Sequence, residues 1–426
     1  MTASMQALDT VTGARQELTV VLPVRLRRTP DWEEGPFPFE LGSRRTDAVT
    51  RSTYFAPASA RVLYGAPGRP RRWYRPLEVE HDGLRLLGME LLRTATARNP
   101  DHALAVLHLS VDRPLLPVLR AIATRGPAAA LPAPLSGPLT PSELLAGIAE
   151  VRDGDGPFAI ARPYTVAFMT PGPEHTPVHR LGTEGELPAG ADRWLWQLAS
   201  RSNPDDFPLA PETAREQLAG AVRISADWSA LVLRQGAAFL GHRSDTGPGD
   251  FFEFGALHSR TVYLDALLLG SLQRDHIDEL TDELSDVFDS PRLARRVAAL
   301  ERNIAVFRST YWRQHLTAHG PANELLLAFQ EQHRLPARFG EILAEAADYS
   351  RLVQTRESLQ ISGALGILTI LGLPLGTAIG ILQVLGDKSP THLLVALGVS
   401  VLVTAGALTT RYGRLVLSSL RGGGKL

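Results

Sequence analysis

Short apolar segments separated by polar turns run through the first 260 residues. Residues 17–26 and 104–110 are rich in valine, leucine and alanine and predict buried strands, and residues 158–169 predict a further strand, interrupted by a proline. Residues 113–124 have the pattern of a helix that follows the second of these strands. Residues 228–240 predict a β-hairpin. This alternation predicts an α/β domain over residues 1–260.

Helical spacing replaces the strand pattern after residue 260. Apolar positions recur at helical intervals over residues 263–288, 291–312 and 323–360. The sequence therefore predicts a stalk of long helices over residues 261–360, and the expected fold class is α+β.

Two long uncharged stretches follow the stalk, at residues 361–385 and 393–410. A helix rises 1.5 Å per residue, so about 20 residues cross a hydrocarbon core of about 30 Å. The prediction is a transmembrane hairpin over residues 361–412 with a tail at 413–426. The alternative is a pair of helices buried in a water-soluble domain, in which 25 residues without any charge would be unusual.

The charges around the hairpin predict its orientation. Arg351 and Arg356 precede the first stretch, and Arg411 and Arg414 follow the second. The N-terminus lacks the basic start and apolar run of a signal peptide. By the positive-inside rule we expect a multi-pass protein of the cell membrane, with a cytoplasmic body and both termini in the cytoplasm.

Composition excludes several kinds of site. The chain is 44% hydrophobic and 21% charged with a net charge of −1, which gives no basis for binding nucleic acid. The absence of cysteine excludes disulfides, thiolate metal sites and a cysteine nucleophile. Neither lysine stands in a P-loop, and no GxSxG or HExxH motif occurs. We therefore expect no enzymatic activity.

Small and polar residues form a stripe on the first uncharged stretch. Thr369, Gly376, Gly380 and Gln383 lie on it at helical steps of three and four. One interpretation is that copies of this helix surround a pore that these residues line. The other is that the stripe packs against the second stretch, and the sequence favours neither.

Acidic residues form a second stripe on the predicted helix at 263–288. Asp278, Asp282 and Asp286 follow one another at steps of four, where like charges repel. A divalent cation held between subunits would relieve this repulsion. A solvated helix face is the simpler interpretation, so these residues are only weak metal-site candidates.

The order of these parts resembles the CorA-type divalent metal ion transporters, best over residues 261–412. That family commonly carries Leu-Pro-Leu, then Gly-Ile, then a Gly-Met-Asn signature in its first span. Here Leu373-Pro374-Leu375 and Gly380-Ile381 are present, but Gln383-Val384-Leu385 replaces the signature. The resemblance implies a homo-oligomer, a pentamer in that family, whose first spans line a pore for magnesium-type cations. A regulatory Mg²⁺ ion is the one cofactor it suggests.

Two functions are consistent with this sequence. The first is transport of divalent cations by a CorA-like membrane protein. The second is a non-transporting sensor or effector on the same membrane-anchored scaffold, whose body binds a ligand or a protein partner. The missing signature, which supplies the asparagine at the pore entrance in that family, motivates the second.

Overall fold

A computed structural model describes most of the chain. The described residues are 8–94, 96, 98–123, 135–152, 163–172, 190–202, 210, 216–288, 293–312, 317, 319–384, 386 and 389–410. The chain divides into two compact units. The first unit comprises Met1–Glu279 with Ala305–Phe339, and the second comprises Leu280–Ile304 with Gly340–Leu426.

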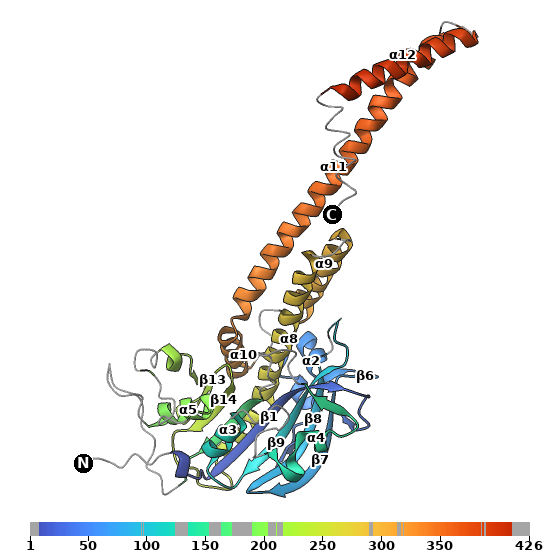
Figure 1. The fold of residues 1–426 in the computed structure, drawn as a ribbon. Coiled ribbons are helices and arrows are strands. Elements are labelled where there is room, and N and C mark those ends of the chain that lie inside the picture. The colour runs from blue at the N-terminus through green and yellow to red at the C-terminus, as the bar shows by residue number, and fades with distance from the viewer. Residues whose placement is uncertain are drawn as a thin grey trace. The chain divides into compact units, whose positions relative to one another are not determined.

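A ten-stranded sheet forms the centre of the first unit (Figure 1). Its order is β12-β13-β14-β11-β1-β9-β8-β7-β2, with β10 also paired to β1. Neighbours are antiparallel except β11 and β14, which are parallel. The strands are β1 Arg15–Leu26, β2 Glu33–Glu34, β7 Arg72–His81, β8 Leu84–Arg93, β9 His102–Val111, β10 Ala149–Val151, β11 Tyr164–Thr170, β12 Val222–Arg223, β13 Trp228–Val232 and β14 Gly236–Gly241. Two small hairpins lie outside it: β3 Glu40–Leu41 with β4 Arg44–Arg45, and β5 Gly65–Ala66 with β6 Arg69–Pro70.

Helices pack on both faces of this sheet. Even-numbered residues of β1, such as Leu18 and Val20, join the main apolar core with side chains of α3 and α5. Odd-numbered residues face the other way, where Glu17 pairs with Arg260 of α7. The described helices assigned wholly to the first unit are η1 Leu8–Thr10, α1 Ala48–Ser52, α2 Pro57–Tyr64, α3 Leu115–Ala123, η3 Gly137–Leu139, α4 Pro141–Leu144, α5 Ala191–Ser200, α7 Phe252–Arg260 and α10 Gly320–Gln332.

The sequence located several of these elements correctly. The strands predicted at 17–26 and 104–110 are β1 and β9, and the helix predicted at 113–124 is α3. The predicted hairpin at 228–240 is β13 and β14. The strand predicted at 158–169 is described only from Tyr164, which begins β11 directly after the proline.

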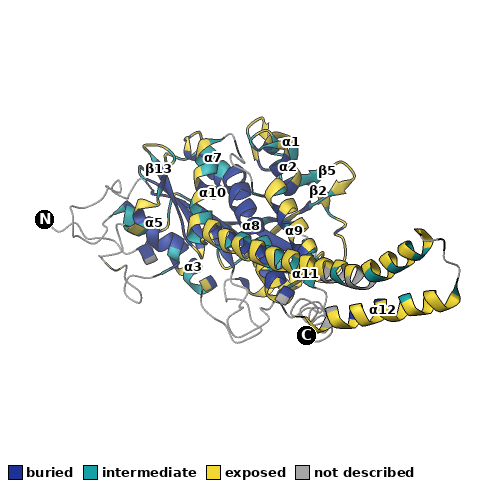
Figure 2. Cartoon of the chain, turned by 90° about the horizontal axis from the view of Figure 1, so that it is seen from above, coloured by how far each residue is buried: buried dark blue, intermediate teal, exposed yellow. Residues whose placement is uncertain are grey.

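Four long helices account for the rest of the described chain. They are α8 Val262–Phe288, α9 Leu293–Thr310, α11 Leu335–Val384 and α12 Pro390–Thr409. The later part of α11 and all of α12 belong to the second unit and form a helical hairpin. Figure 2 colours most of this hairpin as exposed.

The predicted transmembrane hairpin and multi-pass membrane location are corrected by the structure. Among the described residues, no helix combines the length and the apolar character needed to cross a bilayer. The sequence argument counted charges alone. It gave no weight to glycine and uncharged polar residues, which make a helix less apolar. In α12, for example, Ser400, Thr404 and Gly406 are such residues. What stands is a mixed α/β fold with a large sheet and long helices, without a demonstrated membrane span.

Candidate functional site

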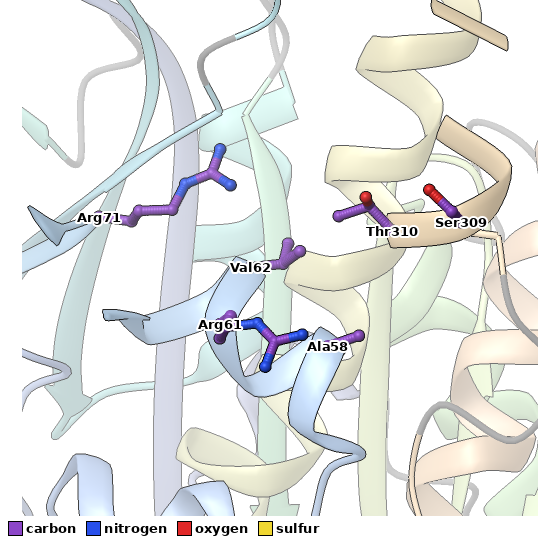
Figure 3. A pocket seen from close by; sticks show the side chains of 6 residues that line it. All are labelled: Ala58, Arg61, Val62, Arg71, Ser309 and Thr310. Atoms are coloured by element: carbon purple, nitrogen blue, oxygen red, sulfur yellow. The ribbon is translucent and has the colours of Figure 1, made fainter. Parts of the chain in front are cut away.

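A small pocket in the first unit has two arginines and two hydroxyl side chains in its wall. Its volume is about 250 Å³. Its six lining residues come from three segments: α2, the residue before β7, and the last turn of α9. They are Ala58, Arg61, Val62, Arg71, Ser309 and Thr310. Figure 3 shows the arginines and the hydroxyl residues on separate segments around it.

Arg71 is held in place by neutral oxygen atoms. Its guanidinium donates to the Tyr311 hydroxyl at 3.2 Å and to the carbonyls of Arg93 and Thr94 at 3.4 and 3.0 Å. These bonds fix the orientation of the group but do not cancel its charge. Burial lowers the pKa of the nearby His276, and the charge of Arg71 contributes in the same direction.

Arg61 is exposed and forms no ion pair with a carboxylate in the described part of the chain. None of the six lining residues is acidic. The pocket therefore contains two positive charges that are not paired with carboxylates in its own wall. Such a site attracts anions.

Two helix ends oppose this attraction. Arg61 lies in the last turn of α2, and Ser309 and Thr310 lie in the last turn of α9. Each helix C-terminus carries a partial charge of about −0.5. Two full positive charges outweigh two half negative charges, so the pocket retains a net positive field.

A buried charge network lies behind the pocket wall. The Arg72 guanidinium pairs with Glu90 and, at 2.6 Å, with Asp265. The Arg51 guanidinium also contacts Asp265, at 3.4 Å, and His108 Nε2 lies 2.9 Å from Glu90. These side chains are at most 1% exposed.

The charges within this network balance. Burial alone would raise the pKa of Glu90, but the charge of Arg72 and the hydrogen bond from His108 hold it well below its usual value. Burial lowers the pKa of His108, so its imidazole is neutral and Nε2–H donates to Glu90. Two arginines thus face two carboxylates, which is the condition under which buried charges are tolerated.

The network anchors the elements that carry the pocket. The Tyr64 hydroxyl, at the end of α2, donates to Asp265 at 2.7 Å. Burial and the Asp265 charge raise the pKa of Tyr64 well above its usual value, so it remains a donor. Arg72 directly follows Arg71 at the start of β7. The segments carrying Arg61 and Arg71 are therefore both tied to one carboxylate on α8.

The small-residue stripe predicted from sequence lies in the helical hairpin. Thr369, Gly376 and Gln383 are exposed, and Gly380 is half-buried. The Thr369 hydroxyl donates to a carbonyl of its own helix at 2.9 Å. A hydrogen bond between α12 and α11 is formed away from these residues, from Ser400 Oγ to the Pro374 carbonyl at 3.2 Å.

The acidic stripe predicted from sequence is distributed among different surroundings. Asp278 pairs with Arg338 at 2.5 Å, while Asp282 and Asp286 are exposed. The neighbouring Glu283 accepts two hydrogen bonds from the Asn303 amide. No group of three or more potential metal ligands occurs within the residues that the structure describes.

Sequence inspection did not identify the arginine pocket. Its two charged residues lie ten positions apart in a segment rich in arginine, where nothing distinguishes them from surface residues. Its other wall lies more than 230 positions further along the chain. One signal was present for the network: Glu90 and Asp265 are single carboxylates within strongly apolar segments.

Comparison of the chain with protein-family models, with curated proteins and with solved structures gave no match.

Proposed function

We propose that the first unit binds a small phosphate-bearing ligand in the arginine pocket. The observation that carries this proposal is the presence of Arg61 and Arg71 in one pocket whose wall contains no carboxylate. This develops the ligand-binding alternative considered from the sequence.

The chemistry of the wall favours phosphate over other anions. A guanidinium presents N–H groups in a planar fork that matches two oxygens of a phosphate. The Thr310 hydroxyl adds a donor from the opposite wall, whereas the Ser309 hydroxyl donates to the Val306 carbonyl of its own helix at 3.0 Å. The methyl and isopropyl groups of Ala58 and Val62 supply an apolar surface for a short organic group. A phosphate monoester of a small metabolite has both features.

The wall favours binding rather than catalysis. None of the lining residues is a histidine, aspartate or glutamate that would act as a general base. The proposed role is therefore that of a sensor or effector domain that responds to an anionic ligand.

Isothermal titration calorimetry of the full chain tests this proposal. Inorganic phosphate and a phosphate monoester such as phosphoserine are the probes, with acetate for comparison, at low ionic strength. We expect saturable binding of both phosphates and weaker binding of acetate. Arg61→Ala removes one exposed charge and should weaken binding by about 1.4 kcal/mol, or about tenfold.

Two further variants separate the pocket from general charge. Arg71→Lys keeps the charge but loses the planar fork, so it should also weaken phosphate binding. Arg75→Ala removes an exposed arginine of the same strand outside the pocket and should leave binding unchanged. The proposal fails if the wild-type chain shows no saturable phosphate binding, or if Arg61→Ala and Arg75→Ala bind equally well.

A further inference from the structure

A histidine lies close to the arginine pocket. Arg71 donates to the Tyr311 hydroxyl at 3.2 Å, and the ring centres of Tyr311 and His276 are 4.0 Å apart. Tyr311 therefore contacts both a cation of the pocket and an imidazole of α8. All three residues belong to the first unit. Because His276 is half-buried, salt and water screen its interaction with Arg71 only in part.

The second nitrogen of this imidazole is the one that can take up a proton. His276 Nδ1 lies 2.9 Å from the Leu272 carbonyl one turn earlier in α8, so the neutral ring donates from Nδ1. Nε2 forms no hydrogen bond within the described part of the chain, and it does not belong to the buried polar atoms that lack a partner. A proton at Nε2 therefore displaces no existing hydrogen bond, and the atom is within reach of water.

Two charged side chains act on His276 among the residues that the structure describes. Burial lowers the pKa of His276, the Asp275 carboxylate on the same helix raises it, and the charge of Arg71 lowers it. Asp275 is itself paired with Arg274 at 3.1 Å, which weakens its effect. Tyr311 faces the imidazole as a neutral ring. Arg71 is therefore the described cation that opposes protonation of His276.

We propose that binding of an anion in the arginine pocket is coupled to uptake of a proton at His276 Nε2. The proposal rests on the proposed function of the pocket and describes how that function depends on pH. A phosphate beside Arg71 offsets the repulsion between the guanidinium and an imidazolium, so the protonated form of His276 is stabilised when the ligand is bound. Coupling between two sites is reciprocal, so protonation of His276 strengthens anion binding by the same factor.

The sign and the size of the effect follow from these contacts. The pKa of His276 is depressed in the free protein, and a bound anion moves it back towards the ordinary value of about 6.5. Anion affinity should therefore rise as the pH falls below about 7. Coupling between sites typically changes affinity by about 5- to 150-fold, and we expect about fivefold because His276 is only half-buried.

Isothermal titration calorimetry of the full chain with sulfate tests the coupling. Sulfate keeps its charge between about pH 5.5 and pH 7.5, whereas the second pKa of a phosphate monoester is about 6. We expect about fivefold tighter binding of sulfate at pH 5.5 than at pH 7.5. At pH 6.5, titrations in two buffers with different ionisation enthalpies should show net uptake of protons on binding. This measurement uses the wild-type chain and requires no variant to fold.

A histidine variant assigns the proton to one residue. His276→Gln keeps a polar side chain but cannot titrate, so its affinity for sulfate should be the same at both pH values, without proton uptake. His81→Gln is the matched control, because His81 lies at the opposite end of β7 from Arg71, and it should retain the pH dependence.

The outcomes separate this coupling from the ligand site itself. Sulfate binding that is independent of pH in the wild type, or equally dependent on pH in His276→Gln, overturns the coupling and leaves the proposed ligand site intact. Absence of saturable sulfate binding at both pH values also overturns the coupling. If phosphate binding is absent as well, the proposed function fails together with it.

Discussion

Replacing Asp265 by asparagine tests whether the buried charge network holds the first unit together. The wild-type carboxylate faces Arg72 at 2.6 Å and Arg51 at 3.4 Å, and it accepts the Tyr64 hydroxyl at 2.7 Å. Asparagine has nearly the same shape but carries no charge. The variant therefore leaves two buried arginines opposite one carboxylate, that of Glu90.

The expected cost of this change is large relative to the stability of a domain. Two unit charges 4 Å apart interact by about 4 kcal/mol at an effective dielectric constant of 20. Removing one partner of a buried pair typically costs about 3–5 kcal/mol after relaxation. Domains are stable by about 5–15 kcal/mol, so Asp265→Asn should remove a substantial share.

Urea unfolding followed by tryptophan fluorescence measures this loss in the first unit. All six tryptophans, at positions 32, 73, 194, 196, 228 and 312, lie in that unit. With a slope of roughly 3 kcal/mol per M, the midpoint should fall by about 1–1.7 M. Asp227→Asn is the matched control, because its pair with Arg243 is 3.3 Å long and about half exposed. An exposed pair contributes at most about 1 kcal/mol, so the control midpoint should move by about 0.3 M or less.

A double-mutant cycle distinguishes a charge effect from a loss of shape. Arg51→Gln combined with Asp265→Asn removes one positive and one negative charge. The double variant should be less destabilised than the sum of the two single variants, with a coupling of about 1–3 kcal/mol. Strict additivity, or equal midpoints for Asp265→Asn and Asp227→Asn, would refute the reasoning.

Three further predictions concern acid stability, a close backbone contact and the link between network and pocket. Burial lowers the folded-state pKa of five histidines, among them His108, so the unfolded state binds more protons than the folded state below pH 6.5. The urea midpoint should therefore fall as the pH is lowered from 7.5 to 5. A rise in the midpoint would contradict this, since the raised pKa of Glu17 is a single opposing effect. A Cβ at Gly88 would collide with the Phe37 ring, so Gly88→Ala should cost about 1–3 kcal/mol in urea unfolding, and less in a Phe37→Leu background. Tyr64→Phe removes the hydrogen bond from α2 to the network and should lower stability by about 1.5–3 kcal/mol, with weaker phosphate binding by calorimetry; unchanged affinity would separate the pocket from the network.

Local pattern was sufficient to locate the central strands but not the network. Seven consecutive residues of β1 are buried, and the aliphatic residues among them, Leu18, Val20, Val21 and Leu22, are close enough together to indicate a strand in the sequence. The network pairs Arg51 with Asp265, which are 214 positions apart. Only the fold brings them together, because no periodicity within one segment encodes a contact between two.

The sequence interpretation of the C-terminal hairpin illustrates a different limit. The absence of charge was detected correctly, and both stretches form helices. The inference from uncharged to membrane-spanning was wrong for the described helices, since crossing a bilayer depends on apolar character over the whole length.

The start of β7 shows why neighbouring residues of one type can differ in function. Arg71 and Arg72 are adjacent, and successive side chains of an extended segment point to opposite sides. Arg72 is fully buried against Glu90 and Asp265, so its charge is neutralised by these carboxylates. Arg71 is bonded only to neutral oxygens, and its charge remains available to an incoming anion. Loss of the Arg72 charge would therefore leave Glu90 and Asp265 buried with one cation fewer and destabilise the first unit, whereas loss of the Arg71 charge would remove a positive charge from the pocket.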